Sequence, residues 1–385
     1  MPSTCSLPVT VTAELQSFDL SVLAGNGLRR GRTTGSCATA AVKAALHLLL
    51  AGERPSHVAV TLPGRVYYLV VPIQRVAVND DGSVRAEVLK DGGDDPDSTH
   101  GATIFAEVRR NGAGEVRFFA GPGVGTATLP GLRVAVGEPA INPVPRLMMR
   151  QAVAEVSKED AGFDLTIGCE NGEVIARKTF NPRLGIVGGI SILGTSGIVE
   201  PMSLSTWIAS VEVYVRVALA DNAQCVAYLP GKIGREFARD SLSLPEKRTV
   251  QIANFLGDAL AFTEGALVEE GRQLDVLWLA GHPGKLAKVL DGYWDTHSSK
   301  SAMAMAGVAR VAAERGFAAG LVQAMEQANT VEAAMETIKH EAGARDLWID
   351  IEQRIGALAQ ARMPSVRRVE VRLFDLSGNL LGAGA

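Results

Sequence analysis

The sequence predicts a two-domain fold of class α/β plus α+β. Residues 1–184 are expected to form an α+β domain with a large mixed β-sheet and covering helices. Residues 185–385 are expected to form an α/β domain with a parallel β-sheet flanked by helices, a helical stretch and an edge strand. The length of 385 residues suits two domains of roughly 100–200 residues each. Short β-rich segments in the first half give way to apolar runs that alternate with helical patterns.

Composition excludes several classes of partner. Hydrophobic residues make up 47% of the chain, and 38 Lys and Arg oppose 42 Asp and Glu for a net charge of -4. This balance argues against nucleic acid or an anionic membrane as a bulk electrostatic partner. The longest apolar run, 40–51, is too short to span a bilayer, and the N-terminus lacks the layout of a secretory signal. We therefore expect a cytoplasmic protein, and the sequence leaves open whether it forms a homo-oligomer.

The first predicted helix covers residues 34–50 and follows a leader, 1–27, that shows little periodicity. Thr33 or Thr34 can cap its N-terminus, and Gly52 ends it. Basic side chains at the positive N-terminal end of this helix are suited to meet carboxylates, although a solvated basic turn would look the same. These side chains are Arg29, Arg30 and Arg32.

The cysteines give no metal signature. Cys5, Cys37, Cys169 and Cys225 are scattered without a Cys-x-x-Cys pair, so neither a zinc site nor an iron–sulfur cluster is indicated and no protein-bound metal is expected. Cys37 lies in the first turn of the predicted helix near arginines, which would lower the pKa of a nucleophilic thiol. We favour the alternative, that Cys37 is a small residue on the packed face of the helix.

Residues 58–180 are rich in β-formers separated by turn signals such as Asn111-Gly112. A second helix is expected near 145–156. The predicted strands are 58–62, 67–71, 84–89, 104–108 and 116–119.

An acidic loop, 90–101, interrupts this β-rich pattern. It contains Asp91, Asp94, Asp95, Asp97 and His100. The side chains could bind a hard cation, but their spacing is not that of an EF-hand. They could also form a solvated acidic turn, or supply a catalytic base or a partner for a ligand's ammonium group. The residues alone do not decide among these three roles.

A glycine-rich stretch, 179–203, combines a predicted strand at 190–193, a turn at 194–197 and a helix capped by Ser203. A strand, a glycine turn and a helix N-terminus together form a generic cradle for a small anionic ligand, because backbone N–H groups can approach it closely. Many such turns are glycine-rich for packing reasons alone.

The second half is expected to build a parallel sheet. Its strands are predicted at 190–193, 225–229, 250–253 and 274–280. The turns that follow them, at 194–197, 229–234, 254–257 and 281–284, would then lie at the carboxyl edge of the sheet, where open α/β sheets bind ligands. Residues 306–361 are helical, and the alternation at 368–373 predicts a half-buried edge strand.

The last of these turns is the richest in reactive side chains. His282, Lys285, Lys288, His297 and Lys300 all lie within or shortly after it. A single histidine is more often structural than catalytic. Two histidines and three lysines at the carboxyl end of a strand favour a binding or catalytic site.

Four stretches resemble signatures of the CbiD family. They are G-R-T-T-G-S-C-A-T-A-A at 31–41, K-D-x-G-D-D-P-D at 90–97, N-P-R-L-G-I-V-G-G-I-S-I-L-G-T-S-G-I-V at 181–199, and G-H-x-G-K-L at 281–286 with T-H-S at 296–298. The resemblance implies a methyltransferase that uses S-adenosylmethionine to methylate C-1 of cobalt-precorrin-5B, giving cobalt-precorrin-6A in anaerobic cobalamin biosynthesis. Cobalt would be carried by the tetrapyrrole substrate.

The resemblance also implies roles for individual residues. Carboxylates of the macrocycle would meet basic and hydroxyl groups at Arg32, Thr33, Thr34, Arg183, Lys232, Lys285 and Lys300. The methyl donor would bind at Gly188, Gly189, Gly194, Thr195, Ser196 and Gly197. Proton removal would fall to His282, His297 or Asp95.

The sequence also bears on two other functions. A phosphoryl or acyl transferase is disfavoured, because the chain has neither G-x-x-x-x-G-K-[S/T] nor G-x-S-x-G. A non-catalytic tetrapyrrole carrier of the same pathway stays open, and binding of S-adenosylmethionine would separate it from the methyltransferase.

Overall fold

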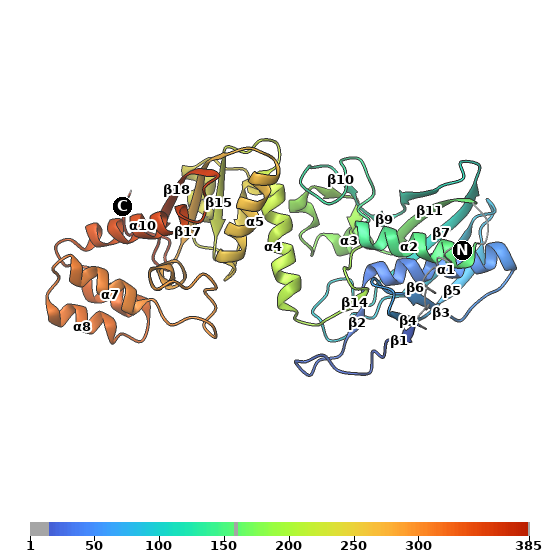
Figure 1. Cartoon of the computed structure of the whole chain (residues 1–385), viewed down its shortest axis with the longest axis horizontal. Coiled ribbons are helices and arrows are strands. Elements are labelled where there is room, and N and C mark those ends of the chain that lie inside the picture. Colours follow the sequence, from blue (N-terminus) through green and yellow to red (C-terminus); the bar gives the residue numbers. More distant parts are fainter. Residues whose placement is uncertain (1–14, 158–160, 384–385) are drawn as a thin grey trace, which may run out of the picture. The chain divides into compact units, whose positions relative to one another are not determined.

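The computed structural model describes residues 15–157 and 161–383, which form two compact units (Figure 1). Unit 1 comprises residues 1–129 and 133–203, and unit 2 comprises residues 130–132 and 204–385. Both units mix helices and sheets, so the mixed α/β character of the chain is confirmed. Cys5 and the first half of the predicted leader lie outside the described residues.

The stretch 185–203 belongs to unit 1, not to the second domain to which the sequence assigned it. Strand β13 (Gly189–Ile190) pairs in parallel with β9 (Gly123–Val124). Strand β14 (Ile198–Val199) pairs antiparallel with β2 (Gly31–Arg32). These long-range pairings hold the segment in unit 1, and its apolar residues join the core there rather than extending the parallel sheet of unit 2.

The main sheet of unit 1 has five strands in the order β5-β6-β7-β11-β8. Neighbouring strands are antiparallel except β11 and β8, which run parallel. The strands are β5 (Arg75–Val78), β6 (Val84–Leu89), β7 (Thr103–Asn111), β11 (Gly162–Cys169) and β8 (Val116–Ala120). A second sheet, in the order β1-β4-β3, comprises β1 (Gln16–Ser17), β4 (Tyr67–Pro72) and β3 (His57–Thr61).

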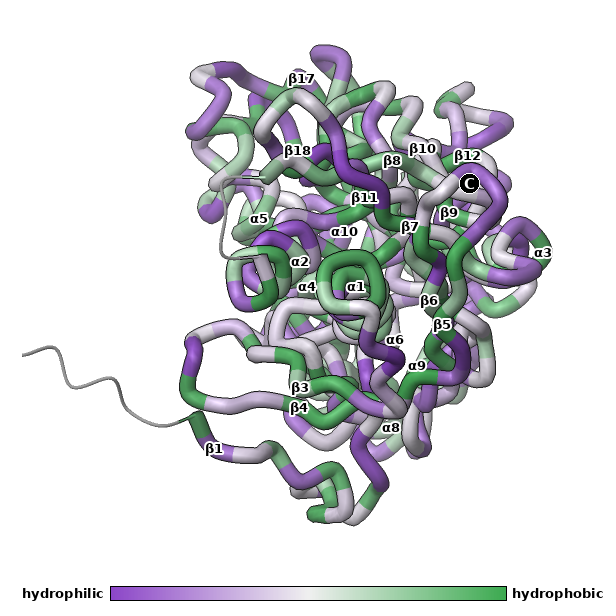
Figure 2. Tube along the Cα trace, turned by 90° about the vertical axis from the view of Figure 1, so that its right-hand side faces the viewer, coloured by the Kyte–Doolittle hydropathy of each residue, from purple (hydrophilic) through white to green (hydrophobic). Residues whose placement is uncertain are grey.

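Helix α1 (Thr34–Ala51) is the core helix of unit 1. Thr33 caps it by accepting a hydrogen bond from Ser36 N, and Gly52 ends it with a φ of 73°, as the sequence predicted. The helix packs against β6, β7 and α2 (Pro143–Val156), and its apolar residues colour much of its tube green in Figure 2. Its length and composition alone would suffice to cross a membrane, but 67% of it is buried inside the unit. The helix therefore has the burial of a core element.

The remaining elements of unit 1 are short. They are β10 (Thr126–Ala127), α3 (Gly172–Ala176), a 3₁₀ turn at Asn181–Leu184 and β12 (Ile186–Val187), which pairs with β10.

Unit 2 is built on a four-stranded sheet in the order β16-β15-β17-β18, in which every pair of neighbours is parallel. The strands are β15 (Cys225–Leu229), β16 (Thr249–Gln251), β17 (Leu274–Gly281) and β18 (Val366–Leu373). Parallel strands at 225–229 and 274–280 are confirmed, and so is the C-terminal edge strand.

Helices pack against this sheet and against one another. Helix α4 packs on α5, and α10 packs on β18. The helices are α4 (Leu204–Leu219), α5 (Leu256–Glu269), α6 (Pro283–Leu286), α7 (Met305–Glu314), α8 (Ala319–Glu326), α9 (Val331–Ile338) and α10 (Ala344–Gln360). Shorter turns of helix cover Phe237–Ser241, Glu246–Arg248 and Ala287–Asp291.

Candidate functional site

Three of the four signature stretches meet at the start of α1. Thr33 N donates to Gly197 O at 3.2 Å, and Gly35 N donates to Leu193 O at 3.0 Å. Arg32 N donates to Asp91 O at 2.7 Å. Segments 31–36, 90–97 and 191–199 are thus neighbours in unit 1, although they are far apart in the sequence.

The hydroxyl groups of the α1 N-terminus hold the glycine turn in place. Thr34 Oγ1 accepts from Leu193 N at 2.9 Å and lies 3.2 Å from Leu193 O, and Ser36 Oγ donates to Gly197 O at 2.5 Å. A Cβ at Gly194 would lie 2.6 Å from Thr33 Oγ1, so no larger residue fits without a shift. Thr33 and Thr34, predicted to bind substrate, are buried and serve this packing.

The predicted strand–turn–helix cradle is not formed. Strand β14 lies between the turn at 194–197 and α4, which belongs to unit 2. The N-terminus of α1 lies beside the turn instead, but its first N–H groups already donate to Leu193 O and Thr33 Oγ1. The expectation that this turn runs directly into a helix was therefore wrong, because short apolar strands with different partners look alike in sequence.

The other residues predicted to bind the donor differ in burial: one glycine is tightly packed, and the rest lie at the surface. A Cβ at Gly189 would lie 2.1 Å from Gly123 O, whereas Gly188 faces open space. Thr195 and Ser196 are exposed, and Ser196 Oγ lies 3.1 Å from Ile198 O. Gly189 therefore serves close strand packing, while Gly188, Thr195 and Ser196 lie at the surface of unit 1.

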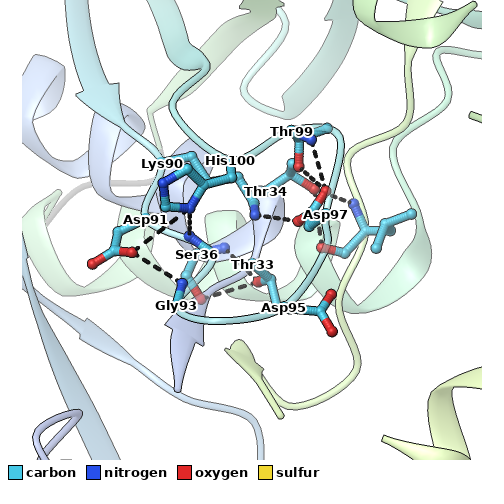
Figure 3. Close-up of polar contacts among 12 residues, drawn as sticks. Thr33, Thr34, Ser36, Lys90, Asp91, Gly93, Asp95, Asp97, Thr99 and His100 are labelled. Atoms are coloured by element: carbon cyan, nitrogen blue, oxygen red, sulfur yellow. Dashed lines mark hydrogen bonds and ion pairs between the residues drawn. The ribbon is translucent and has the colours of Figure 1, made fainter. Parts of the chain in front are cut away.

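The acidic loop is braced from within by a buried ion pair (Figure 3). Lys90 is 2% exposed, and its Nζ lies 2.5 Å from Asp97 Oδ2. The other oxygen of Asp97 accepts from Thr99 N and Thr99 Oγ1, both at 2.7 Å. Burial disfavours the charged form of Asp97, but Lys90 and Thr99 outweigh it and hold the pKa of this carboxyl below its usual value.

The remaining acidic groups of the loop bind protein atoms. Asp94 Oδ2 accepts from Arg29 N at 2.8 Å, and Asp95 Oδ1 accepts from Met202 N at 2.9 Å. His100 Nδ1 accepts from Gly92 N at 3.1 Å. Across residues 15–157 and 161–383, no group of three or more His, Cys, Asp or Glu is arranged to hold a metal ion.

The arginines within or next to the signature stretches of unit 1 differ in their partners and in their exposure. Arg30 binds Glu200 at 2.6 Å and the carbonyls of Val22 and Leu23. The side chain of Arg32 is 14% exposed and lies 3.7 Å from Asp91, and its buried Nε has no hydrogen-bond partner among the described residues. Arg183 is exposed, with its guanidinium 6.0 Å from the ring centroid of Phe180. Arg32 thus has a buried, unused donor near the three converging stretches.

Cys37 is completely buried in the core of unit 1. Burial raises the pKa of its thiol to about 11, even though Lys90 and Arg32 act in the opposite direction. At pH 7 only about one such thiol in ten thousand would be ionised.

We expect Cys37 to be inert in the native protein. Iodoacetamide at pH 7 should leave Cys37 unmodified, whereas the same treatment in urea should alkylate it fully, as read by peptide mass spectrometry. Rapid native alkylation, or a loss of activity by orders of magnitude in a folded Cys37→Ala variant, would show that Cys37 is a nucleophile.

In unit 2, the turns after the parallel strands bring a second set of predicted residues to one edge of the sheet. Lys285 Nζ donates to Pro230 O at 3.1 Å and to Ala253 O at 3.3 Å, so it joins the turns after β15 and β16. Lys232 is exposed in the turn after β15.

One ring nitrogen of His282 accepts a hydrogen bond, and the other lies close to a carboxylate. Its Nδ1 accepts from Gly284 N at 3.1 Å, which places the proton of the neutral ring on Nε2. Nε2 lies 2.7 Å from Glu332 Oε1 without the alignment of a hydrogen bond. Burial lowers the pKa of His282, although Glu332 and Asp375 oppose the shift. The sequence analysis missed Glu332, because it lies far from His282 in the chain and has no motif of its own.

His297 and Lys300 lie on a loop anchored to the turn after β16. Asp295 Oδ1 accepts from Asn254 Nδ2 at 3.0 Å, and Asp295 Oδ2 lies 3.2 Å from Lys300 Nζ. His297 is exposed, and its Nδ1 lies 2.7 Å from Ser299 Oγ. His297 is therefore the more accessible of the two predicted histidines.

A pocket of about 420 Å³ lies elsewhere in unit 1 and contains none of the predicted site residues. Arg85 occupies it, pairing with Glu87 at 2.9 Å, Glu107 at 3.2 Å and Glu170. Because one guanidinium already holds all three carboxylates, the pocket is a structural ion-pair network.

Comparison with known proteins identifies the family. The structure defines a mixed α/β protein whose signature stretches build two side-chain clusters. The CbiD family model matches residues 21–201, and the model described as CbiD, C-terminal domain, matches residues 295–385. The chain belongs to the CbiD family.

Two similar proteins share a name. A cobalt-precorrin-5B C(1)-methyltransferase of Ralstonia nicotianae is 63% identical over 95% of this chain and 96% of its own length. One of Chromobacterium violaceum, with the same name, is 59% identical over 96% of this chain and 99% of its own length. A crystal structure of the cobalamin biosynthesis protein CbiD from Archaeoglobus fulgidus is 27% identical, covering 72% of this chain and 85% of that one with a TM-score of 0.38.

Proposed function

We propose that this protein transfers a methyl group to C-1 of cobalt-precorrin-5B. The observation that carries the proposal is the 63% and 59% identity to two cobalt-precorrin-5B C(1)-methyltransferases along almost the whole chain. The four signature stretches supply the residues of both side-chain clusters described above. The substrate is then a cobalt-carrying tetrapyrrole.

We infer that the methyl donor is S-adenosylmethionine. Its sulfonium methyl is already electrophilic, so the protein needs mainly to align this methyl with the nucleophilic ring carbon and to exclude water. No covalent enzyme intermediate is required, in agreement with the burial of Cys37.

Within unit 1, Arg32 and Arg183 are the candidates to meet carboxylate side chains of the macrocycle, and within unit 2 the candidates are Lys232 and Lys300. Arg32 has a buried Nε without a partner among the described residues, and the other three side chains are exposed. The acceptor for a proton released on methylation is His297 or Asp95, both of which are accessible at least in part. His282 is less suited to this role, because its Nδ1 already accepts from Gly284 N and its side chain is only 15% exposed.

The proposal is tested by an anaerobic incubation of the purified protein with S-adenosylmethionine and cobalt-precorrin-5B. We expect a product heavier than the substrate by one transferred methyl group, formed only when protein and donor are both present. Tight binding of the tetrapyrrole without any turnover or donor binding would show a carrier protein instead.

A further inference from the structure

The strand order of unit 2 contains a topological switch point. Strand β15 comes first in the sequence, β16 lies on one side of it, and the chain then crosses to place β17 on the other side and β18 beyond. The direction of winding therefore reverses between β15 and β17. Open parallel sheets bind their ligands in the crevice outside the carboxyl ends of the strands at such a point.

The two turns that flank this switch point approach each other closely. A Cβ at Gly281, the last residue of β17, would lie 3.0 Å from Pro230 Cδ in the turn after β15. A Cβ at Gly234, whose φ is +94°, would lie 3.0 Å from Ala280 O. Both glycines allow the turns to pack together at the carboxyl ends of β15 and β17.

Lys285 places a cation across these strand ends. Its ammonium donates to the carbonyls of Pro230 and Ala253, which follow β15 and β16. An ammonium has three N–H donors, so one is left for another acceptor. Among residues 15–157 and 161–383, no carboxylate lies within ion-pair distance of Lys285 Nζ. Burial and the neighbouring Lys288 lower the pKa of Lys285, which shows that its charge is poorly compensated.

Lys288 adds a second buried cation near this edge. It is 6% exposed, and its Nζ donates to Thr296 O at 3.0 Å and Ser301 Oγ at 2.8 Å, both uncharged acceptors. Burial lowers the pKa of Lys288, and the charge of Asp295 opposes this shift, but among the described residues Asp295 forms its ion pair with Lys300. A partly buried cation without an ion-pair partner is costly, and a bound anion removes that cost. The two lysines therefore favour a ligand with a carboxylate.

Negative groups also lie at this edge of the sheet, and they favour a ligand that carries both charges. Glu332 lies beside His282, and the charge of Asp375, which follows β18, also acts on His282. An edge that carries both signs suits a zwitterionic amino-acid group. It suits a macrocycle bearing many carboxylates less well, because the two acidic side chains would repel it.

We infer that the switch point between β15 and β17 binds the amino-acid end of the methyl donor, with Lys285 pairing with its carboxylate. The inference rests on the proposed function. It places the donor within unit 2 instead of at the glycine turn 194–197, and it assigns Lys285 to the donor instead of to the macrocycle.

The test measures binding of S-adenosylhomocysteine to the full-length protein by calorimetry. Lys285→Gln keeps an N–H group for Pro230 O and Ala253 O but removes the charge. We expect it to weaken S-adenosylhomocysteine binding by about 10- to 100-fold, the range of one charged hydrogen bond. Lys285→Arg should recover part of the affinity, and Lys339→Met, which removes an exposed lysine of α9's C-terminal turn, should change nothing.

A second probe, 5′-methylthioadenosine, separates recognition from folding because it lacks the amino-acid group. Wild type and Lys285→Gln should bind it equally. Equal loss for both probes would overturn the inference, since Lys285 would then act through the structure of the edge. Unchanged S-adenosylhomocysteine affinity with weakened cobalt-precorrin-5B binding would also overturn it and assign Lys285 to the macrocycle. A wild-type protein that binds neither adenosyl compound would contradict the proposed donor itself.

Discussion

Gly93→Ala is expected to lower the free energy of unfolding by about 3–5 kcal/mol. A Cβ at Gly93 would lie 2.2 Å from Arg29 O, a backbone atom, and Gly93 has a φ of +65°. The clash falls where the acidic loop meets the segment before α1, because Asp94 N donates to Arg29 O at 3.0 Å. Strain and overpacking therefore add at one position.

Gly101→Ala is the matched control. Gly101 belongs to the same loop and has a φ of +75°, but a Cβ there would meet nothing within 4 Å. Gly101→Ala should therefore lower the free energy of unfolding only by the left-handed backbone penalty, about 1–2 kcal/mol. The four tryptophans, Trp207, Trp278, Trp294 and Trp348, all lie in unit 2, so unit 1 should be followed by hydrogen exchange of the α1 amides. Equal losses in the two variants would show that the contact between the loop and Arg29 does not constrain unit 1.

Asp97→Asn is the second variant with a large expected effect. It keeps the shape of the side chain but leaves the Lys90 ammonium, which is 2% exposed, without its counter-ion. Removing one partner of a buried ion pair typically costs about 3–5 kcal/mol. Asp94→Asn is the control, because the Arg29–Asp94 pair is 57% and 39% exposed and such pairs contribute at most about 1 kcal/mol.

The pH dependence of this difference has a defined sign. The pKa of Asp97 is lower in the folded protein than its usual value. Its contribution is therefore complete above the pKa of the unfolded chain, about 3.9, and is lost as the pH falls through the lower folded value. The stability gap between wild type and Asp97→Asn should be largest between about pH 5 and 8 and should shrink below about pH 4. A gap that widened on acidification would mean that Lys90 does not stabilise the charged form of Asp97.

Local patterns were sufficient to predict several elements. Helix α1 follows from Thr33 as cap, a run of small apolar residues and Gly52 as stop. Strands β15 and β17 follow from apolar runs that are covered on both faces of a parallel sheet. Strand β11 was not singled out, although Phe163, Leu165 and Ile167 alternate and are completely buried. A count of alternating residues would have found it.

Long-range pairing could not be predicted in the same way. The run 190–193 looks like a strand of the parallel sheet, yet β13 pairs with β9 in unit 1. Nothing in the apolar pattern of a two-residue strand specifies its partner. For the same reason, the sequence located Lys285 at a carboxyl edge but could not place it at a switch point, since that requires the order β16-β15-β17-β18.

In the candidate site, too, the partners of a side chain could not be predicted when they lie far away in the chain. The sequence left three roles open for the acidic loop, and the structure shows Asp94, Asp95 and Asp97 accepting hydrogen bonds from Arg29, Met202, Lys90 and Thr99. Side chains that look available in a motif can be satisfied by partners more than 60 residues away in the chain, as Arg29 is from Asp94. Contacts of this kind depend on the fold and have no signature in the loop itself.

The most direct test of the proposed reaction locates the transferred atom. The protein is incubated without oxygen with cobalt-precorrin-5B and S-adenosylmethionine carrying a ¹³C-labelled methyl group, and the tetrapyrrole product is examined by ¹³C NMR. We predict a single enriched methyl signal, attached to C-1 of the macrocycle. A labelled methyl group on any other carbon would contradict the proposed function. So would a tetrapyrrole that stays unlabelled after incubation with the folded protein and the labelled donor.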